Sequence, residues 1–107
     1  MSDITIYNVI TSDAALAMLD THIEFLAKVS TNAALNLMEV ILSDIESLSQ
    51  FPKRFSVYEN EFIAEPRYRK MLSAKRYLII YEIINDTVFV DYIIDCRQDY
   101  DWLLNQI

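Results

Sequence analysis

The sequence contains no glycine at all and only two prolines. Without glycine no glycine-rich loop can cradle a phosphate, which excludes the nucleotide-binding classes that depend on such loops. Turns must instead be made by Asn, Asp, Ser and Lys. A single cysteine, Cys96, excludes an internal disulfide and is typical of a reducing cytoplasm. With no histidine nearby, we expect Cys96 to be a partly buried small side chain and not a nucleophile.

Histidine is also almost absent, since His22 is the only one, so no second His exists to build a metal site. We therefore expect no metal and no cofactor. No apolar run approaches the roughly 18–20 residues of a membrane span, and the N-terminus lacks a basic region followed by an apolar core, so neither membrane contact nor a signal peptide is predicted. We expect a cytoplasmic protein. A length of 107 residues, 53% of them apolar, predicts one globular domain over residues 1–107.

Positive charge is scarce and unevenly placed. The net charge is −7, and residues 1–52 hold seven acids against a single base, Lys28. Every arginine lies in the second half, with a concentration of basic residues at Arg67, Arg69, Lys70, Lys75 and Arg76. An acidic first half and a mixed second half differ from the basic field of a general nucleic-acid binder. We therefore expect no strong binding of free nucleic acid.

The densest run of β-branched and aromatic residues is residues 76–84, which is apolar on both faces as expected of a central strand. Asn85 and Asp86 follow as a tight turn, because both tolerate positive φ. Residues 87–94 form the next predicted strand, with a polar break at Asp91. A third strand is predicted upstream at residues 67–72. These three segments predict an antiparallel meander.

The first half of the sequence predicts one strand and then two helices. Residues 4–10 alternate between apolar and polar side chains from Ile4 to Asn8, as in a strand with one covered face. Residues 11–13 and 30–32 supply helix-capping oxygens. Each of these segments precedes an apolar stripe at helical spacing, and the second helix should stop near Phe51 and Pro52. The stripes contain the following residues: Leu16, Leu19, Ile23, Leu26, Ala27; and Ala34, Leu37, Met38, Ile41, Leu42, Ile45, Leu48.

Residues 53–66 show no periodicity and predict an ordered connection, and residues 100–106 predict a short last helix. The predicted order is therefore β-α-α-β-β-β-α, an α+β fold in which a helical hairpin packs on one mainly antiparallel sheet. His22 between apolar residues is more typical of a helix surface than of a ligand, and Tyr77 and Tyr81 are predicted to pack in the core or on the sheet.

In this order and spacing the segments resemble the RelE/ParE superfamily of bacterial type II toxins over nearly the whole chain, most closely its ParE and plasmid-stabilisation branch. No single motif is a specific signature; the ordered set carries the resemblance. The matching segments are Leu48-Xaa-Xaa-Phe51-Pro52, Tyr68-Arg69-Lys70-Xaa-Leu72, residues 76–83, and residues 88–94 followed by Arg97-Gln98-Asp99.

The resemblance implies a toxin neutralised by a cognate antitoxin, whose C-terminal segment wraps it. ParE-branch toxins are associated with poisoning DNA gyrase, whereas RelE-branch toxins cut messenger RNA on the ribosome. The arginines of the RNA-cleaving branch match Ser73 and Leu78 here and are therefore missing, which favours a toxin that binds its target over an enzyme. If the chain is an endoribonuclease after all, Arg97 and Tyr100 are the catalytic candidates. A non-toxic antitoxin-binding relative is the third alternative, favoured by the −7 charge because family toxins are commonly basic.

The resemblance and the basic concentration together place target or antitoxin binding at five residues: Arg69, Lys70, Lys75, Arg76 and Arg97. The alternative is that these are solvated strand-face charges or ion pairs. Arg69, Lys70 and Arg76 would then pair with Glu59, Glu61 and Glu65. Arg97 would pair with Asp95 or Asp99.

Overall fold

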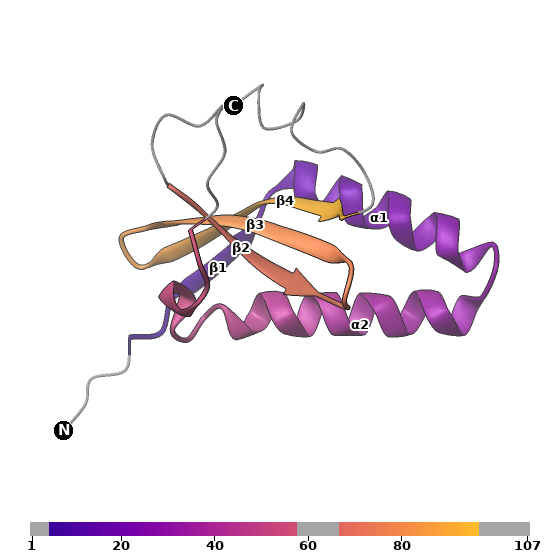
Figure 1. Ribbon diagram of the computed structural model, residues 1–107, viewed down its shortest axis with the longest axis horizontal. Coiled ribbons are helices and arrows are strands. Elements are labelled where there is room, and N and C mark those ends of the chain that lie inside the picture. The colour runs from indigo at the N-terminus through magenta and orange to yellow at the C-terminus, as the bar shows by residue number, and fades with distance from the viewer. Residues whose placement is uncertain (1–4, 58–66, 97–107) are drawn as a thin grey trace.

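The computed structural model describes residues 5–57 and 67–96. Two helices, α1 (Asp13–Ala27) and α2 (Thr31–Ser47), form an antiparallel hairpin beside a four-stranded sheet (Figure 1). Both helices begin at a serine cap, as predicted. The Ser12 side chain accepts a hydrogen bond from Ala15 N at 3.0 Å, and that of Ser30 accepts one from Ala33 N at 3.1 Å.

The second helix ends earlier than predicted. Its last helical residue is Ser47, whereas the proline signal pointed to Phe51. Phe51 instead adopts the left-handed region, with φ and ψ both 51°, and the 3-10 turn η1 (Pro52–Arg54) follows. The Arg54 side chain donates to the Ser47 and Phe51 carbonyl oxygens at 3.5 and 3.0 Å, so an arginine satisfies the open end of the helix.

The sheet contains β1 (Asn8–Thr11), β2 (Tyr68–Ser73), β3 (Tyr77–Ile84) and β4 (Thr87–Asp95) in the spatial order β1-β4-β3-β2. The predicted meander is confirmed, since β2–β3 and β3–β4 are antiparallel. The first strand begins at Asn8, later than predicted, and pairs in parallel with β4. Alternation along the sequence predicts a strand but says nothing about its neighbour, so this parallel pairing was not foreseen.

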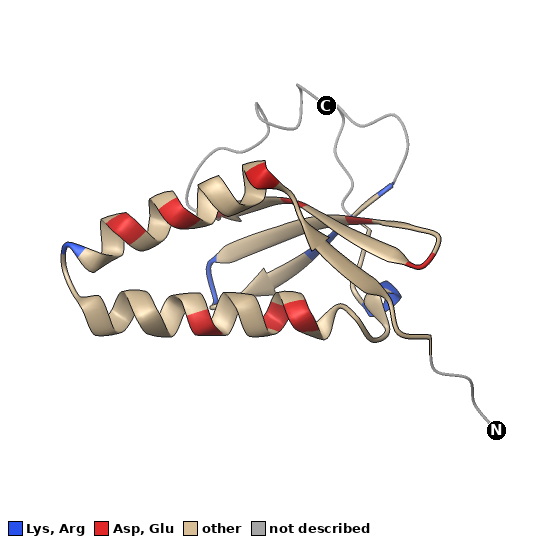
Figure 2. Ribbon diagram, turned by 180° about the vertical axis from the view of Figure 1, so that it is seen from behind, with Lys and Arg blue, Asp and Glu red and all other residues tan. Residues whose placement is uncertain are grey.

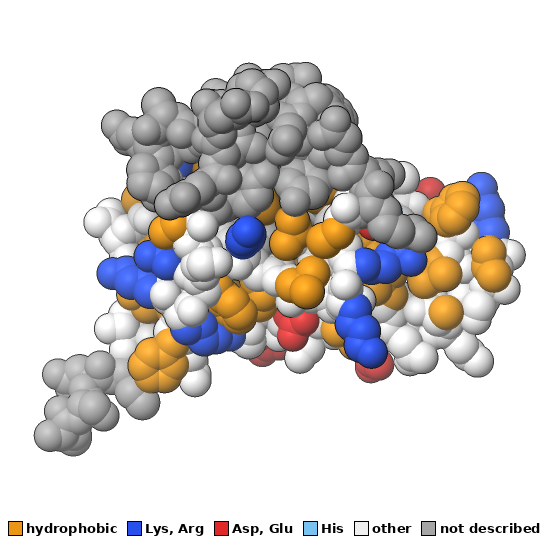
Figure 3. Space-filling view, in the orientation of Figure 1, with side chains coloured by type: hydrophobic (Ala, Val, Ile, Leu, Met, Phe, Trp, Pro, Cys, Tyr) orange, Lys and Arg blue, Asp and Glu red, His pale blue; other side chains and the backbone are white. Residues whose placement is uncertain are grey.

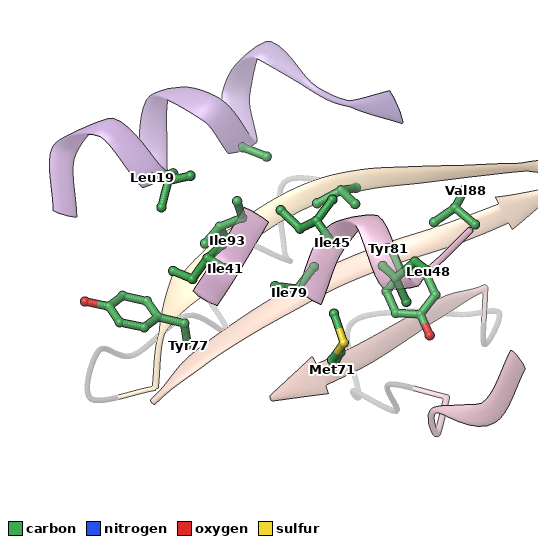
Figure 4. Packing of buried hydrophobic residues seen from close by; sticks show 12 residues of the cluster. Leu19, Ile41, Ile45, Leu48, Met71, Tyr77, Ile79, Tyr81, Val88 and Ile93 are labelled. Carbon is green, nitrogen blue, oxygen red and sulfur yellow. The ribbon is translucent and has the colours of Figure 1, made fainter. Parts of the chain in front are cut away.

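The central strand β3 is buried on both faces, as its composition predicts. On one face, its alternate residues pack against the helices in the main core, where Ile41 and Ile45 of α2 meet Ile79 (Figure 4). Tyr81 closes this core near η1, where its hydroxyl donates to the buried Pro52 carbonyl oxygen at 2.6 Å. The main core contains Ala15, Leu19, Ile41, Ile45, Leu48, Met71, Tyr77, Ile79, Tyr81, Val88, Val90 and Ile93.

The opposite face of the sheet carries a second, smaller cluster of buried residues: Tyr68, Leu78, Ile80 and Ile94. A sheet with apolar residues on both faces explains why the central strand reads as a continuous apolar run and not as an alternation.

Three expectations from the sequence are wrong in detail, and a fourth is not tested. Leu16 and Leu42, assigned to the apolar stripes, are 40% and 44% exposed because they lie at the flanks of the buried helix faces. His22 is half-buried, and its ring centroid lies 5.2 Å from that of Tyr77, so it belongs to the helix–sheet contact. Cys96 is exposed, since β4 ends one residue earlier. The predicted last helix lies outside the described residues.

Candidate functional site

Four of the five basic residues predicted as a binding surface, Arg69, Lys70, Lys75 and Arg76, lie on β2 or in the turn that follows it. Arg69 pairs with Tyr81 in the β2–β3 register, near η1. Its Nη1 donates to the Phe55 carbonyl oxygen at 2.7 Å and to that of Lys53 at 3.3 Å. These bonds hold the segment after η1 against β2 and fix the position of the guanidinium group.

Arg69 shares a pocket of about 440 Å³ with Lys53, Arg67, Ile83 and Asn85, which we call the basic pocket. Three of its five lining residues are cations. Because β2 and the end of β3 lie together in the sheet, the basic pocket is formed by η1, by the start of β2 and by the β3–β4 turn.

Arg67 is held in place at the edge of the basic pocket by its neighbour. Its Nη2 donates to the Tyr68 hydroxyl at 2.7 Å, and its guanidinium carbon lies 4.8 Å from the centre of the Tyr68 ring. The hydrogen bond to Tyr68 is the main reason why the pKa of Arg67 is raised. The same nitrogen lies 3.7 Å from the Glu82 carboxylate, while the Arg67 side chain stays 54% exposed.

The opposite end of β2 carries Lys75 and Arg76 in the β2–β3 turn. Arg76 Nη2 lies 3.0 Å from Asp95 Oδ2, and its guanidinium carbon lies 5.1 Å from the centre of the Tyr77 ring. Asp95 is only 4% exposed, so this pair joins the turn to the end of β4. Lys75 is exposed. Within the described ranges, Arg76 therefore pairs with Asp95, while Glu59, Glu61 and Glu65 lie outside them.

Lys70, also predicted for binding, is exposed, and its backbone N–H donates to the Ser56 carbonyl oxygen at 3.2 Å. The predicted residues thus divide into two groups: Arg69 in the basic pocket, and Lys75 with Arg76 at the far turn. Arg97 and Tyr100 lie outside the described residues. Lys53 was absent from the predicted site because its segment has no periodicity, although its charge next to a proline-initiated turn is visible in the sequence.

A carboxyl pair lies beside Arg67. The pKa of Asp91 is raised to about 7, mainly by burial and also by the neighbouring Glu82 carboxyl group, while Tyr68 and Arg67 oppose the rise. Burial also raises the pKa of Tyr68 to about 12. Asp91 is the extra residue of a β-bulge, since Ile80 pairs with Tyr92 and Tyr81 with Val90.

Ser73 and Leu78 are the positions at which the family resemblance places the arginines of the RNA-cleaving branch. Ser73 is 1% exposed, and its hydroxyl donates to Asp44 Oδ2 at 2.6 Å, which ties β2 to α2. Leu78 is 8% exposed and belongs to the second apolar cluster. Neither position presents a cation to a phosphate, as RNA cleavage would require.

Among residues 5–57 and 67–96, no group of three or more His, Cys, Asp or Glu side chains could hold a metal ion. Of the helices in the described ranges, none is long and apolar enough to cross a membrane.

A helical hairpin on a mixed four-stranded sheet, with basic residues along an edge strand, defines a small α+β domain with known structural relatives. The chromosomal ParDE toxin–antitoxin system from P. aeruginosa contains a chain that superposes with a TM-score of 0.70 at 14% identity, over 85% of this chain and 97% of that one. No curated protein matches the chain in sequence. The family model of the ParE toxin of type II toxin–antitoxin systems, parDE, matches residues 9–100. The chain belongs to this ParE toxin family.

Proposed function

We propose that this ParE-family toxin acts by binding a protein target, such as DNA gyrase, and is silenced by a cognate antitoxin. The observation that carries the proposal is the pair of positions Ser73 and Leu78. The Ser73 hydroxyl donates to Asp44, and the Leu78 side chain is buried among apolar residues. Neither position therefore offers a cation for phosphoryl chemistry. The relative from P. aeruginosa is named as a ParDE system, which supports an antitoxin partner.

The test begins with expression of the chain alone and together with the small open reading frame next to its gene. We expect growth arrest in the first case and normal growth in the second. The purified chain should inhibit DNA supercoiling by gyrase, and the antitoxin should relieve the inhibition. Relaxation of DNA by a topoisomerase I serves as the specificity control.

Three results would contradict the proposal in different ways. Growth without arrest favours a non-toxic antitoxin-binding relative, for which the −7 charge is the motivation. Arrest with unaffected supercoiling and intact messenger points to another binding target. Arrest with cleaved messenger, seen by primer extension, identifies a ribosome-dependent endoribonuclease, and Arg97 and Tyr100 would then be the first residues to replace.

A further inference from the structure

The basic pocket gathers three cations on a chain whose net charge is −7. The chain has nine basic and sixteen acidic residues, and the acids of the described part lie mainly along α1 and α2 (Figure 2). Three cations line the basic pocket: Lys53, Arg67 and Arg69. Among the described residues, one ion pair to these cations is present, the 3.7 Å contact from Arg67 to Glu82.

Two of the three cations are held in place before any ligand arrives. Arg69 is fixed by two backbone carbonyl oxygens, and Arg67 by the Tyr68 hydroxyl and ring. The two hydrogen-bond acceptors of Arg69 are neutral carbonyl oxygens, and Arg67 remains 54% exposed despite its 3.7 Å contact with Glu82. Fixed guanidinium groups bind an oxyanion with little loss of side-chain entropy, and the exposed Lys53 can add a third contact.

A second pocket of about 370 Å³ adjoins the first and shares Lys53 with it. We call it the apolar pocket; it is lined by Thr5, Tyr7, Phe51, Pro52, Lys53 and Arg54. Phe51 is 63% exposed, and its backbone is in the left-handed region. Figure 3 shows basic and hydrophobic side chains next to each other at this end of the molecule.

The basic pocket and the apolar pocket together fit a peptide better than a polynucleotide. A peptide segment with an acidic and a large apolar side chain can fill both pockets at once. A nucleic-acid strand would also bring a row of phosphates toward a molecule of net charge −7, which repels it.

We infer that the basic pocket and the apolar pocket together bind an acidic segment of the antitoxin, with a carboxylate at Lys53, Arg67 and Arg69 and an apolar side chain against Tyr7 and Phe51. The identity of this partner rests on the proposed function, whereas its chemistry rests on the two pockets. Charge pairing at such a rim weakens with salt, because exposed charges are screened.

The experiment measures the Kd of the antitoxin, produced from the neighbouring open reading frame, for the wild-type chain and for single variants at 50 and 300 mM NaCl. Lys53→Glu should raise the Kd at least about tenfold at 50 mM and much less at 300 mM. Phe51→Asn, which suits the left-handed backbone, should raise the Kd at both salt concentrations. Lys28→Glu is the matched control, since it reverses a charge on the helical hairpin, and should change the Kd less than about twofold.

Thermal unfolding of each variant separates lost binding from lost folding. If wild type and Lys53→Glu bind the antitoxin equally well, the inference is overturned and the proposed function stands. If the wild-type chain does not bind the antitoxin, both are overturned. A labelled 12-nucleotide oligoribonucleotide provides the last comparison. If Lys53→Glu loses binding of this oligonucleotide and still binds the antitoxin, the basic pocket binds phosphate groups and the inference is overturned.

Discussion

Asp91 is the residue at which β4 leaves regular pairing. Its carboxyl group lies near Glu82 and Tyr68, and its backbone carbonyl oxygen accepts a hydrogen bond from Ser12 Oγ at 3.1 Å. Burial raises its pKa from 3.8 to about 7, so the native state binds a proton that the unfolded chain has released by neutral pH. The resulting stabilisation is complete below the unfolded pKa and is lost as the pH rises through about 7.

Asp91→Asn should therefore stabilise the protein at high pH, because the amide is neutral at every pH and can donate to Glu82. We expect the Tm at pH 8 to rise by about 4 °C or more, and the gain to shrink at pH 5.5. Differential scanning fluorimetry across this pH range measures both effects.

Asp20→Asn is the control, since this carboxylate is exposed on α1 and should leave the pH profile unchanged. Equal profiles for wild type and Asp91→Asn would show that Asp91 is already ionised in the native state at neutral pH.

The sequence indicates Asp91 as a polar break in a strand but not as a member of a carboxyl pair. Glu82 lies on the preceding strand, and its distance from Asp91 depends on a register that shifts between Ile80 and Tyr81. A bulge of one residue has no signature in this sequence, because no glycine marks it.

At the scale of elements, the turn between β2 and β3 is the least expected local structure. Ala74 and Lys75 have φ of 51° and 68°, and Arg76 N donates to the Ser73 carbonyl oxygen at 3.3 Å. Two successive left-handed residues are typical of a type I′ turn, which normally uses Asn and Gly. The predicted turn residue Asn85 also has positive φ, at 56°, as its residue type favours.

Glycine at this turn should relieve backbone strain. We expect Lys75→Gly to be about 0.5–1 kcal/mol more stable than Lys75→Ala, because only glycine adopts positive φ without a Cβ clash. Urea denaturation of both variants measures the difference.

The two variants remove the same charge, so their difference reports the backbone alone. If alanine were as stable as glycine, the left-handed conformation of Lys75 would carry no strain.

The two helix caps offer a comparison between elements. Ser30→Ala should cost about 1 kcal/mol, the usual value of a lost N-cap. Ser12→Ala should cost about 2 kcal/mol, because its hydroxyl both caps α1 and donates to the Asp91 carbonyl oxygen, joining the helix to the bulge of β4. Urea unfolding of the two variants gives the values.

Thr21→Ala, which removes an exposed hydroxyl on α1, should stay within about 0.5 kcal/mol of wild type. Equal costs at Ser12 and Ser30 would mean that the bond to Asp91 adds nothing to stability.

Element types and order were predictable over the described residues because each depends on local patterns: serine caps, helical stripes and dense β-branched runs. The boundaries of the helices and strands were less predictable. The end of α2 involves Arg54, which lies seven residues beyond Ser47 and donates to the Ser47 carbonyl oxygen. The parallel pairing of β1 depends on β4, which is far away in the sequence.

At the scale of the whole molecule, acidic helices and a basic sheet edge occupy different surfaces (Figure 2). The candidate site was predictable in part, because the clustering of basic residues near β2 is visible in the sequence. That Arg69 and Arg76 belong to opposite ends of the strand follows only from the fold. Lys53 joins the site through η1, which composition does not reveal.

This distribution predicts weak binding to free nucleic acid. At 150 mM salt we expect the Kd for a labelled 30-base-pair DNA to exceed about 100 μM, measured by fluorescence anisotropy, because the net charge of −7 opposes the phosphates.

The double variant Asp20→Lys, Glu24→Lys adds four units of positive charge and should tighten this binding. A Kd below about 1 μM for the wild-type chain would contradict the prediction and require a nucleic-acid site on the sheet edge.

The pairing of β1 with β4 has a consequence for the order of events during synthesis. The Ser12–Asp91 bond beside this pairing spans 79 residues, so the helical hairpin emerges from the ribosome well before the strand that β1 must join. At about 5–20 residues per second, β1 waits roughly 4–16 s for its neighbour. The main core, which needs Val88, Val90 and Ile93, cannot close earlier. The chain therefore cannot reach its folded form before β4 has been synthesised, and a helical hairpin with one uncovered face exists until then.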